Sequence, residues 1–247
     1  MTLKIQLPLL LLVLLPLPSL FAQTTFNYAK DFSTILQRTK DKQAPLSYDL
    51  LLNRFKANDT TLTDFEVLAL MIGFTDKPDY KPYEDLSEER DIYQLNGEGK
   101  YREGLDKANE FLSTHPLSVK VLMEKSYSFY KLEQQDSAQY YMDQAGRIFE
   151  AMYFSGDGKS RETPTFALGP ADGQDYIRKF IGEDIGMMGS GRDSNGNFLD
   201  MLELKFKDGE TVMLYFIIQH ATNKMFAGTG MEKKLQEQKK TKKKSKE

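Results

Sequence analysis

Apolar residues between positions 23 and 84 recur every three or four residues, which is the period of an amphipathic helix. Ser47 is placed to begin a second helix, and Thr63-Asp64-Phe65-Glu66 has the spacing of a capping box before a third. Pro78 and Pro82 then predict a loop. The inward-facing positions expected for these three N-terminal helices are Tyr28, Phe32, Ile35, Leu36, Leu51, Leu52, Phe55, Val67, Leu68, Met71 and Ile72.

Residues 85–154 carry a weak repeat with an offset of 34 positions. Gly104 aligns with Ala138, Phe111 aligns with Ala145, and Pro116 follows the first copy. A small residue at the first of these positions lets the two helices of a pair pack closely, and this phasing is typical of tetratricopeptide (TPR) repeats. The pattern predicts helices near 87–96, 100–113, 118–131 and 136–152. Two ordinary helical hairpins are the alternative interpretation.

Beyond residue 154 the apolar period becomes alternating. Asp208-Gly209 separates two alternating segments, 197–207 and 210–218, and predicts a β-hairpin. Shorter strands are expected at 165–169 and 185–189, with a helix over 174–181 that turns Tyr176, Ile177 and Phe180 inward. Pairing Lys207 with Glu210 gives the hairpin one apolar face that covers this helix: Leu202, Leu204, Phe206, Met213, Tyr215 and Ile217.

The expected fold class is therefore α+β. N-terminal helices over 23–84 precede TPR-like helix pairs over 85–154, and a small α+β unit with an antiparallel hairpin follows over 155–228. That unit is near the lower end of domain size, so we expect it to pack on the helical part.

The composition excludes several kinds of site but does not indicate a particular reaction. The chain has 247 residues, 40% hydrophobic and 28% charged, which excludes wholesale disorder. It contains no cysteine, so disulfides, thiolate metal sites and a cysteine nucleophile are excluded. With only two histidines in the whole sequence, we expect neither a metal site nor a cofactor.

The two ends of the chain differ from the rest. Lys4 precedes an apolar run that ends at Ala22, the pattern of a secretory signal peptide over 1–22. Prolines within the run argue against a retained membrane anchor. We therefore expect a periplasmic or secreted protein with no membrane span after cleavage. Residues 229–247 are expected to form a basic, disordered tail that touches polyanions only weakly, without recognising a specific nucleic acid.

Several segments together resemble a known family. They are Arg54-Phe55, Asp59-Thr60-Thr61-Leu62-Thr63, Gly73-Phe74, Asp79-Tyr80-Lys81-Pro82-Tyr83, the helix hairpin over 97–116 and the loop Ser155-Gly156-Asp157-Gly158. The chain resembles domain of unknown function family 4919, an uncharacterised family of exported bacterial proteins. Where that family's pattern has an aromatic pair before Gly73, this chain has Met71-Ile72. The resemblance implies a Gram-negative periplasmic or envelope location and implies no reaction.

Two loops have a partial likeness to ligand-binding motifs. Gly158-Lys159-Ser160 lacks the glycine that a phosphate loop requires five residues before Gly158, since that position is Tyr153. Asp193–Asn197 lacks the ligand spacing and the closing glutamate of a calcium loop. We expect both segments to be turns.

Three titratable residues remain as candidates for chemistry. His115 and His220 have no evident catalytic partner, and we expect them to be surface or capping residues. Asp200 is in phase with the apolar face of the hairpin. It is either a perturbed catalytic carboxylate or, as we expect, a strand-end residue that bonds a backbone N–H or Tyr215.

Two classes of function fit the sequence. The favoured one is a non-enzymatic module that binds another envelope protein or a peptide in a TPR-like groove. The alternative is a hydrolase or small-ligand-binding protein with its site in the α+β unit, although no catalytic constellation is found. The expected groove residues are Glu89, Tyr93 and Asn96 from the first repeat, and Lys120, Met123, Tyr127 and Tyr130 from the second. Tyr127 and Tyr130 packing against the rest of the protein is the competing interpretation.

Overall fold

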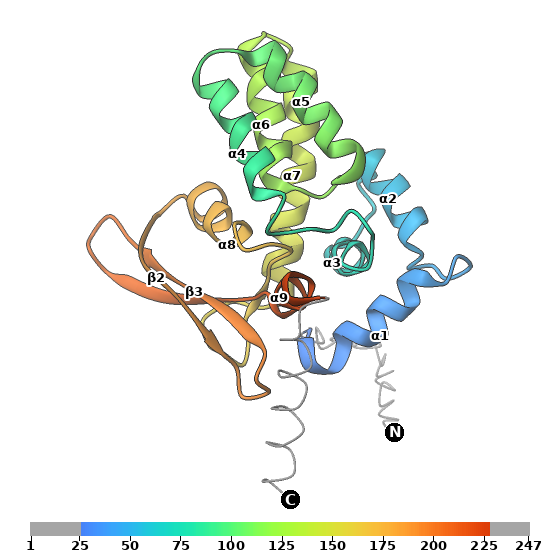
Figure 1. The fold of residues 1–247 in the computed structure, drawn as a ribbon, viewed down its shortest axis with the longest axis vertical. Coiled ribbons are helices and arrows are strands. Elements are labelled where there is room, and N and C mark those ends of the chain that lie inside the picture. The colour runs from blue at the N-terminus through green and yellow to red at the C-terminus, as the bar shows by residue number, and fades with distance from the viewer. Residues whose placement is uncertain (1–25, 228–247) are drawn as a thin grey trace, which may run out of the picture.

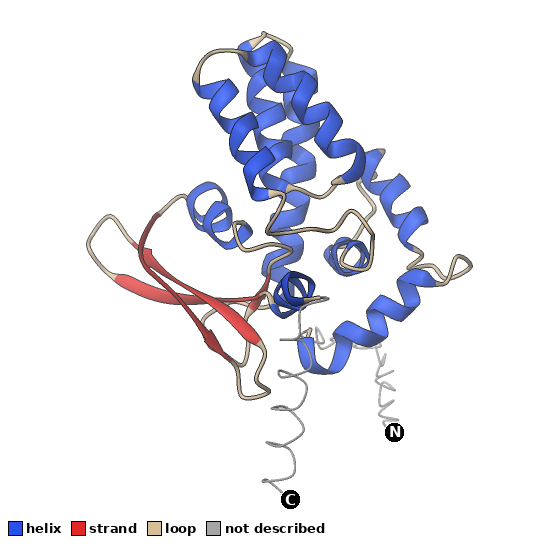
Figure 2. Ribbon diagram, in the orientation of Figure 1, coloured by secondary structure: helices blue, strands red, loops and turns tan. Residues whose placement is uncertain are grey.

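The computed structural model describes residues 26–227, which form a helical part and a small sheet unit (Figures 1 and 2). The signal peptide expected over 1–22 and the tail expected over 229–247 lie outside the described residues. None of the helices described between 26 and 227 is both long and apolar enough to cross a membrane. The helical part comprises α1 (Tyr28–Lys40), α2 (Tyr48–Lys56), α3 (Asp64–Phe74), α4 (Leu86–Gly97), α5 (Tyr101–Thr114), α6 (Val119–Lys131) and α7 (Gln135–Ser155).

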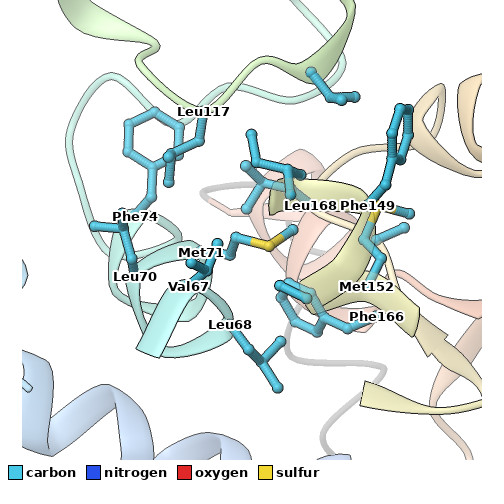
Figure 3. Close-up of a cluster of buried hydrophobic side chains, with 14 of the residues drawn as sticks. Val67, Leu68, Leu70, Met71, Phe74, Leu117, Phe149, Met152, Phe166 and Leu168 are labelled. Atoms are coloured by element: carbon cyan, nitrogen blue, oxygen red, sulfur yellow. The ribbon is translucent and has the colours of Figure 1, made fainter. Parts of the chain in front are cut away.

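Helix α3 is the central helix of the N-terminal part. Its predicted capping box is confirmed: the Glu66 N–H donates to Thr63 Oγ1 at 3.3 Å, and the Thr63 N–H donates to Glu66 Oε2 at 2.9 Å. Every residue from Val67 to Phe74 is buried, because α1, α2 and α7 all pack against this helix. Figure 3 shows side chains of α3 facing Met152 and Phe166 in the core.

One arginine joins α2 to the start of α3. Arg54 Nε lies 2.7 Å from Asp59 Oδ2, and one of its terminal nitrogens lies 2.6 Å from Glu66 Oε1. The same guanidinium donates to Thr61 Oγ1 at 3.0 Å. These charge-assisted hydrogen bonds fix the α2–α3 loop, so two of the segments that carry the family resemblance have a structural explanation.

Helices α4–α7 form two hairpins at the predicted positions. Gly104 is buried between helices, and a Cβ built on it would lie 2.7 Å from Asn96 Oδ1. Ala138 is also buried, and its carbonyl accepts a hydrogen bond from Ser126 Oγ at 2.7 Å. Both small residues of the 34-residue offset therefore lie at close helix contacts.

We expect Gly104→Leu to lower the free energy of unfolding by roughly 1–3 kcal/mol. The new side chain would displace Asn96, whose amide donates to the Glu124 carbonyl at 2.9 Å and accepts from Ser128 Oγ at 2.6 Å. Urea unfolding followed by circular dichroism measures the loss. Arg102→Ala, at an exposed position of the same helix, should change stability by less than about 0.5 kcal/mol. Equal stability of the two variants would contradict the close contact at Gly104.

The sheet unit has four strands in the order β1-β4-β3-β2, and the fold is α+β as predicted. β1 is parallel to β4, while β4 with β3 and β3 with β2 are antiparallel. The helix α8 and the π-helix η1 connect β1 to β2, and α9 follows β4. The bounds are β1 (Thr165–Phe166), α8 (Asp172–Asp175), η1 (Tyr176–Ile181), β2 (Asp184–Arg192), β3 (Phe198–Lys205), β4 (Thr211–Ile217) and α9 (Gln219–Phe226).

The β3–β4 register differs by one residue from the predicted pairing of Lys207 with Glu210. The Phe206 N–H donates to the Glu210 carbonyl at 2.9 Å, so the turn has three residues instead of two. Gly209 has φ +94°, the left-handed conformation that a three-residue hairpin turn requires near its end.

This one-residue shift changes which side chains of β4 face α8. Leu214 and Phe216 lie on the face of Leu202, whereas Met213 and Tyr215 lie on the opposite face. A Cβ built on Gly173 of α8 would be 3.0 Å from both Leu202 and Phe216, so α8 packs directly on this face. The prediction that the hairpin covers a helix is confirmed, but the predicted residues of β4 were wrong.

The helices of the sheet unit also depart from the sequence pattern. Tyr176 and Ile177 are buried as expected, but Phe180 is 42% exposed. The segment is a π-helix, and the Phe180 ring still lies 5.1 Å from Tyr176 and 5.4 Å from Phe149, at the outer edge of the core. Helix α9 was not predicted, because residues 219–226 are short and carry no apolar period.

One hydrophobic core runs through both parts of the protein. Phe149 and Met152 of α7, Phe166 of β1 and Leu168 meet the side chains of α3 (Figure 3). The Tyr80 hydroxyl also donates to the Leu168 carbonyl at 2.5 Å across this junction. The three segments expected over 23–84, 85–154 and 155–228 thus share their buried interior.

Candidate functional site

The residues predicted to line a groove divide into an exposed and a buried group. Tyr93, Tyr127 and Tyr130 are 56%, 42% and 55% exposed, so the tyrosines of α6 are not part of the core. Lys120 lies beside Tyr93, with Nζ 5.9 Å from the centre of that ring. The three remaining residues, Glu89, Asn96 and Met123, are buried.

A hollow of about 700 Å³ lies beside α6 and α7, and we call it the α7 groove. Its apolar residues include Met123, Met142, Phe149 and Phe180, and Gly146 of α7 lies among them. A Cβ built on Gly146 would meet no atom within 4 Å, so open space lies above the glycine. The charged residues of the groove are Asp143, Arg147, Glu150 and Lys179.

The two exposed tyrosines of α6 share a helix face with Met123, which lines the α7 groove. Met123, Tyr127 and Tyr130 are spaced by four and three residues, so they lie on one face of α6. Met123 lies in the groove, and the two tyrosines follow it toward the end of the helix. Of the seven predicted groove residues, Met123 alone lines this hollow, whose other walls come from the loop before α3, from α7 and from η1.

A second hollow lies where α4, the α5–α6 loop and the start of α8 meet, and we call it the acidic cleft. Its volume is only about 40 Å³, room for a few water molecules. Its titratable residues are Tyr80, Asp85, Glu89, His115 and Asp172.

Two carboxyl groups from different elements face this cleft. Ser118 Oγ donates to Glu89 Oε1 at 2.7 Å, and the Gly169 N–H donates to Asp172 Oδ2 at 2.8 Å. Burial raises the pKa of Glu89 to about 7, helped by the charges of neighbouring acids and opposed by Ser118 and Lys120. Burial, together with the charge of Glu89, raises the pKa of Asp172 to about 8. Asp172 consequently retains its proton at neutral pH, where Glu89 is close to half protonated.

His115 is the C-cap residue of α5, in agreement with the expected capping role. Its Nε2 lies 2.7 Å from the Asp79 carbonyl oxygen and 3.4 Å from Asp85 Oδ1. Burial lowers the pKa of His115, but hydrogen bonds and the charge of Asp85 raise it by more. The net effect is a pKa above the usual value for histidine. Ser118 in the same cleft is engaged with Glu89 and with the Val121 N–H. These residues do not form a Ser-His-Asp triad.

His220 is not at the surface, contrary to the sequence expectation. It is 5% exposed, and its ring stacks on Phe166 at a centroid distance of 4.5 Å and on Phe32 at 5.7 Å. Tyr28 and Tyr80 complete the surrounding aromatic cluster. Helix α9 begins immediately after β4 and carries the histidine into the core, a connection that the sequence pattern did not reveal.

Asp200 lies within β3 rather than at its end. It pairs with Phe216, and burial raises its pKa to about 6. Tyr215 is opposite Met201 and so on the other face of the sheet, because of the one-residue shift in register. The expected bond from Asp200 to Tyr215 was therefore wrong.

The two loops with motif-like sequences are turns, as predicted. The Gly158 N–H donates to the Thr163 carbonyl at 2.9 Å. Asp193 Oδ1 accepts the Asn197 N–H at 2.7 Å between β2 and β3. In the part of the chain that the structure describes, no group of three or more His, Asp or Glu side chains is arranged to hold a metal ion.

Sequence reasoning did not identify several residues of the two hollows. Asp172, Gly146 and Phe180 each lie in a helix whose neighbours come from distant parts of the chain. Glu89 and Asp172, for example, are brought to the same cleft because α4 and α8 both pack on α6. No local spacing signals such a contact.

Comparison with known proteins identifies the family of the chain. No curated protein and no solved structure matches the chain. The family model described as domain of unknown function (DUF4919) matches residues 33–226, a range that includes the walls of both the α7 groove and the acidic cleft. The chain belongs to the DUF4919 family.

Proposed function

We propose that the protein is an exported, non-enzymatic binding module that holds a peptide segment of another envelope protein in the α7 groove. The observation that carries this proposal is the groove itself. Its volume of about 700 Å³ and its lining of methionine and phenylalanine side chains within a charged rim suit an apolar anchor of a partner. The acidic cleft, at about 40 Å³, is too small for such a ligand.

Two further features favour a peptide over a compact small molecule. Tyr127 and Tyr130 are exposed on the face of α6 that carries Met123, and they combine apolar rings with polar hydroxyl groups, a combination enriched at protein interfaces. Methionines 123 and 142 are flexible and adapt to different side chains. Charges of both signs at the rim, such as Arg147 and Glu150, are placed to pair with the ends or side chains of an extended segment.

Blocking the groove should abolish peptide binding without unfolding the protein. Peptides selected from a random display library against the wild-type chain serve as the probe, and their affinity is measured by fluorescence anisotropy. We expect Gly146→Trp to weaken binding by more than about tenfold, because the indole occupies the open space. Replacing a glycine inside a helix also removes a destabilising residue, so the variant should fold.

A matched control and a second variant make the result specific. Gly97 also has no atom within 4 Å of a built Cβ but lies outside the groove, so Gly97→Trp should leave peptide affinity unchanged. Tyr127→Ala combined with Tyr130→Ala should weaken binding while circular dichroism and melting stay nearly unchanged. Equal affinity of wild type and Gly146→Trp, or failure to select any peptide, would contradict the proposal.

A further inference from the structure

Helix α8 and η1 form one continuous helical segment whose ends lie in the two hollows. Asp172, at its beginning, lines the acidic cleft. Lys179 and Phe180, near its end, line the α7 groove. Figure 1 shows this segment, labelled α8, between the helical part and the sheet. One helical segment therefore connects the acidic cleft with a wall of the groove.

The cleft end of this segment meets an excess of acidic groups. The charge of Glu89 of α4 acts on Asp172, and that of Asp85 acts on Glu89. Glu124 of α6 acts on Asp175, and Lys120 of α6 offsets part of the negative charge on Glu89 and Asp175. Asp175 of α8 adds a further carboxyl, offset in part by Lys120, Lys179 and Arg178. The Tyr80 hydroxyl also faces Asp172, and His115 faces Asp85.

The opposite side of α8 offers no compensating charge. There Gly173 packs on Leu202 and Phe216 of the sheet, which are apolar. If Glu89 and Asp172 both ionise, the repulsion between the two carboxylates is opposed by Lys120 and by the apolar contacts of Gly173 and of the buried residues Tyr176 and Ile177. Protons on these two carboxyl groups relieve that repulsion.

We propose that proton release from Glu89 and Asp172 moves the start of α8 away from the acidic cleft, loosens α8 from the helical part and, through the continuous α8–η1 segment, shifts Phe180 and Lys179 at the wall of the α7 groove. The inference concerns regulation of the groove and rests on the proposed function only for its biological meaning. The movement itself is a property of the unliganded chain and is testable without any partner.

The direction of the pH effect follows from the environment of the carboxyl groups. In the closed arrangement the pKa values of Glu89 and Asp172 are about 7 and about 8, whereas a solvated carboxyl titrates near 4. Between about pH 4 and about pH 7–8, the closed arrangement thus binds more protons than the loosened one. Raising the pH through about 7–8 favours the loosened arrangement, and lowering the pH favours the closed one.

Methionine methyl resonances measure the movement at the groove. Met123 and Met142 line the groove together with Phe180, and Met225 of α9 serves as an internal reference. In the full mature chain labelled with ¹³C-methyl methionine, we expect the Met123 and Met142 signals to shift in a step centred near pH 7–8. The Met225 signal should not follow this step.

Variants that cannot ionise should remove the step. Glu89→Gln with Asp172→Asn preserves side-chain shape, and we expect the Met123 and Met142 signals of this double variant to lose their titration. Glu88→Gln, at an exposed position next to Glu89, should behave as wild type. If the double variant does not fold, Lys120→Met tests the same inference, because loss of this cation should move the step to higher pH.

Either of two results overturns the inference. One is a wild-type chain whose Met123 and Met142 signals do not titrate near neutral pH. The other is a step that persists in the double variant, or that stays at the same pH in Lys120→Met. Peptide selection does not enter these measurements, so the proposed function and the proton control fail or succeed separately.

Discussion

Phe166→Ala is expected to lower the free energy of unfolding by about 3–5 kcal/mol, a large part of the stability of a typical domain. Phe166 is 0% exposed, and its ring packs on His220 at 4.5 Å and edge-on to Phe26 at 6.2 Å. Its backbone is fixed as well, because the Phe166 N–H donates to Ser155 Oγ at 2.7 Å. The surrounding elements are therefore held in place and cannot collapse into the cavity.

The same variant tests whether the helical part and the sheet unit unfold together. Phe166 lies where α1, α7 and α9 meet β1, so its loss should shift one cooperative transition, seen alike by far-ultraviolet circular dichroism and tyrosine fluorescence. Tyr153→Ala removes an aromatic ring that is 62% exposed and should cost no more than about 0.5 kcal/mol. Two separate transitions, with only one affected by Phe166→Ala, would mean that the core is not shared.

The helices were the most predictable part of the fold, because their signals are local. The capping box at Thr63 and the small residues Gly104 and Ala138 act within one helix or one helix pair, and the structure confirms all three. The hairpin was predicted too, but its register depended on whether Asp208-Gly209 made a two- or three-residue turn. That single choice decides which face every side chain of β4 occupies.

The candidate sites were less predictable, because each depends on contacts between distant segments. The spacing along α6 placed Met123, Tyr127 and Tyr130 on one helix face, but only Met123 lines the groove, and the opposite wall comes from Phe180 on η1, more than fifty residues after Met123. Glu89 was expected in an open groove. Instead, the packing of α8 against the helical part buries it beside Asp172, which changes its chemistry from a surface charge to a proton-holding group.

His220 should make the protein sensitive to acid, and His220→Leu should remove this sensitivity. Burial lowers the pKa of His220 to about 3, whereas a histidine in the unfolded chain titrates near 6.5. Between these values the unfolded chain binds one more proton than the folded protein, so this residue's contribution to stability falls as the pH falls from about 6.5 to about 3. The aromatic neighbours Phe166 and Phe32 offer no carboxylate to offset an imidazolium charge.

The measurement is the difference in free energy of unfolding between His220→Leu and wild type, from urea titrations at several pH values. Whatever the difference at pH 7, it should change in favour of the variant by about 1.4 kcal/mol per pH unit below about 6, and by roughly 4–5 kcal/mol in total. Comparing the two chains cancels the opposite slope that Glu89 and Asp172 contribute, since both chains retain those carboxyl groups. His115→Leu is the control: the pKa of His115 is raised rather than lowered, so the difference between that variant and wild type should change in favour of wild type as the pH falls. A constant difference for His220→Leu across this range would mean that the imidazole of His220 takes up its proton in the folded protein as readily as in the unfolded chain.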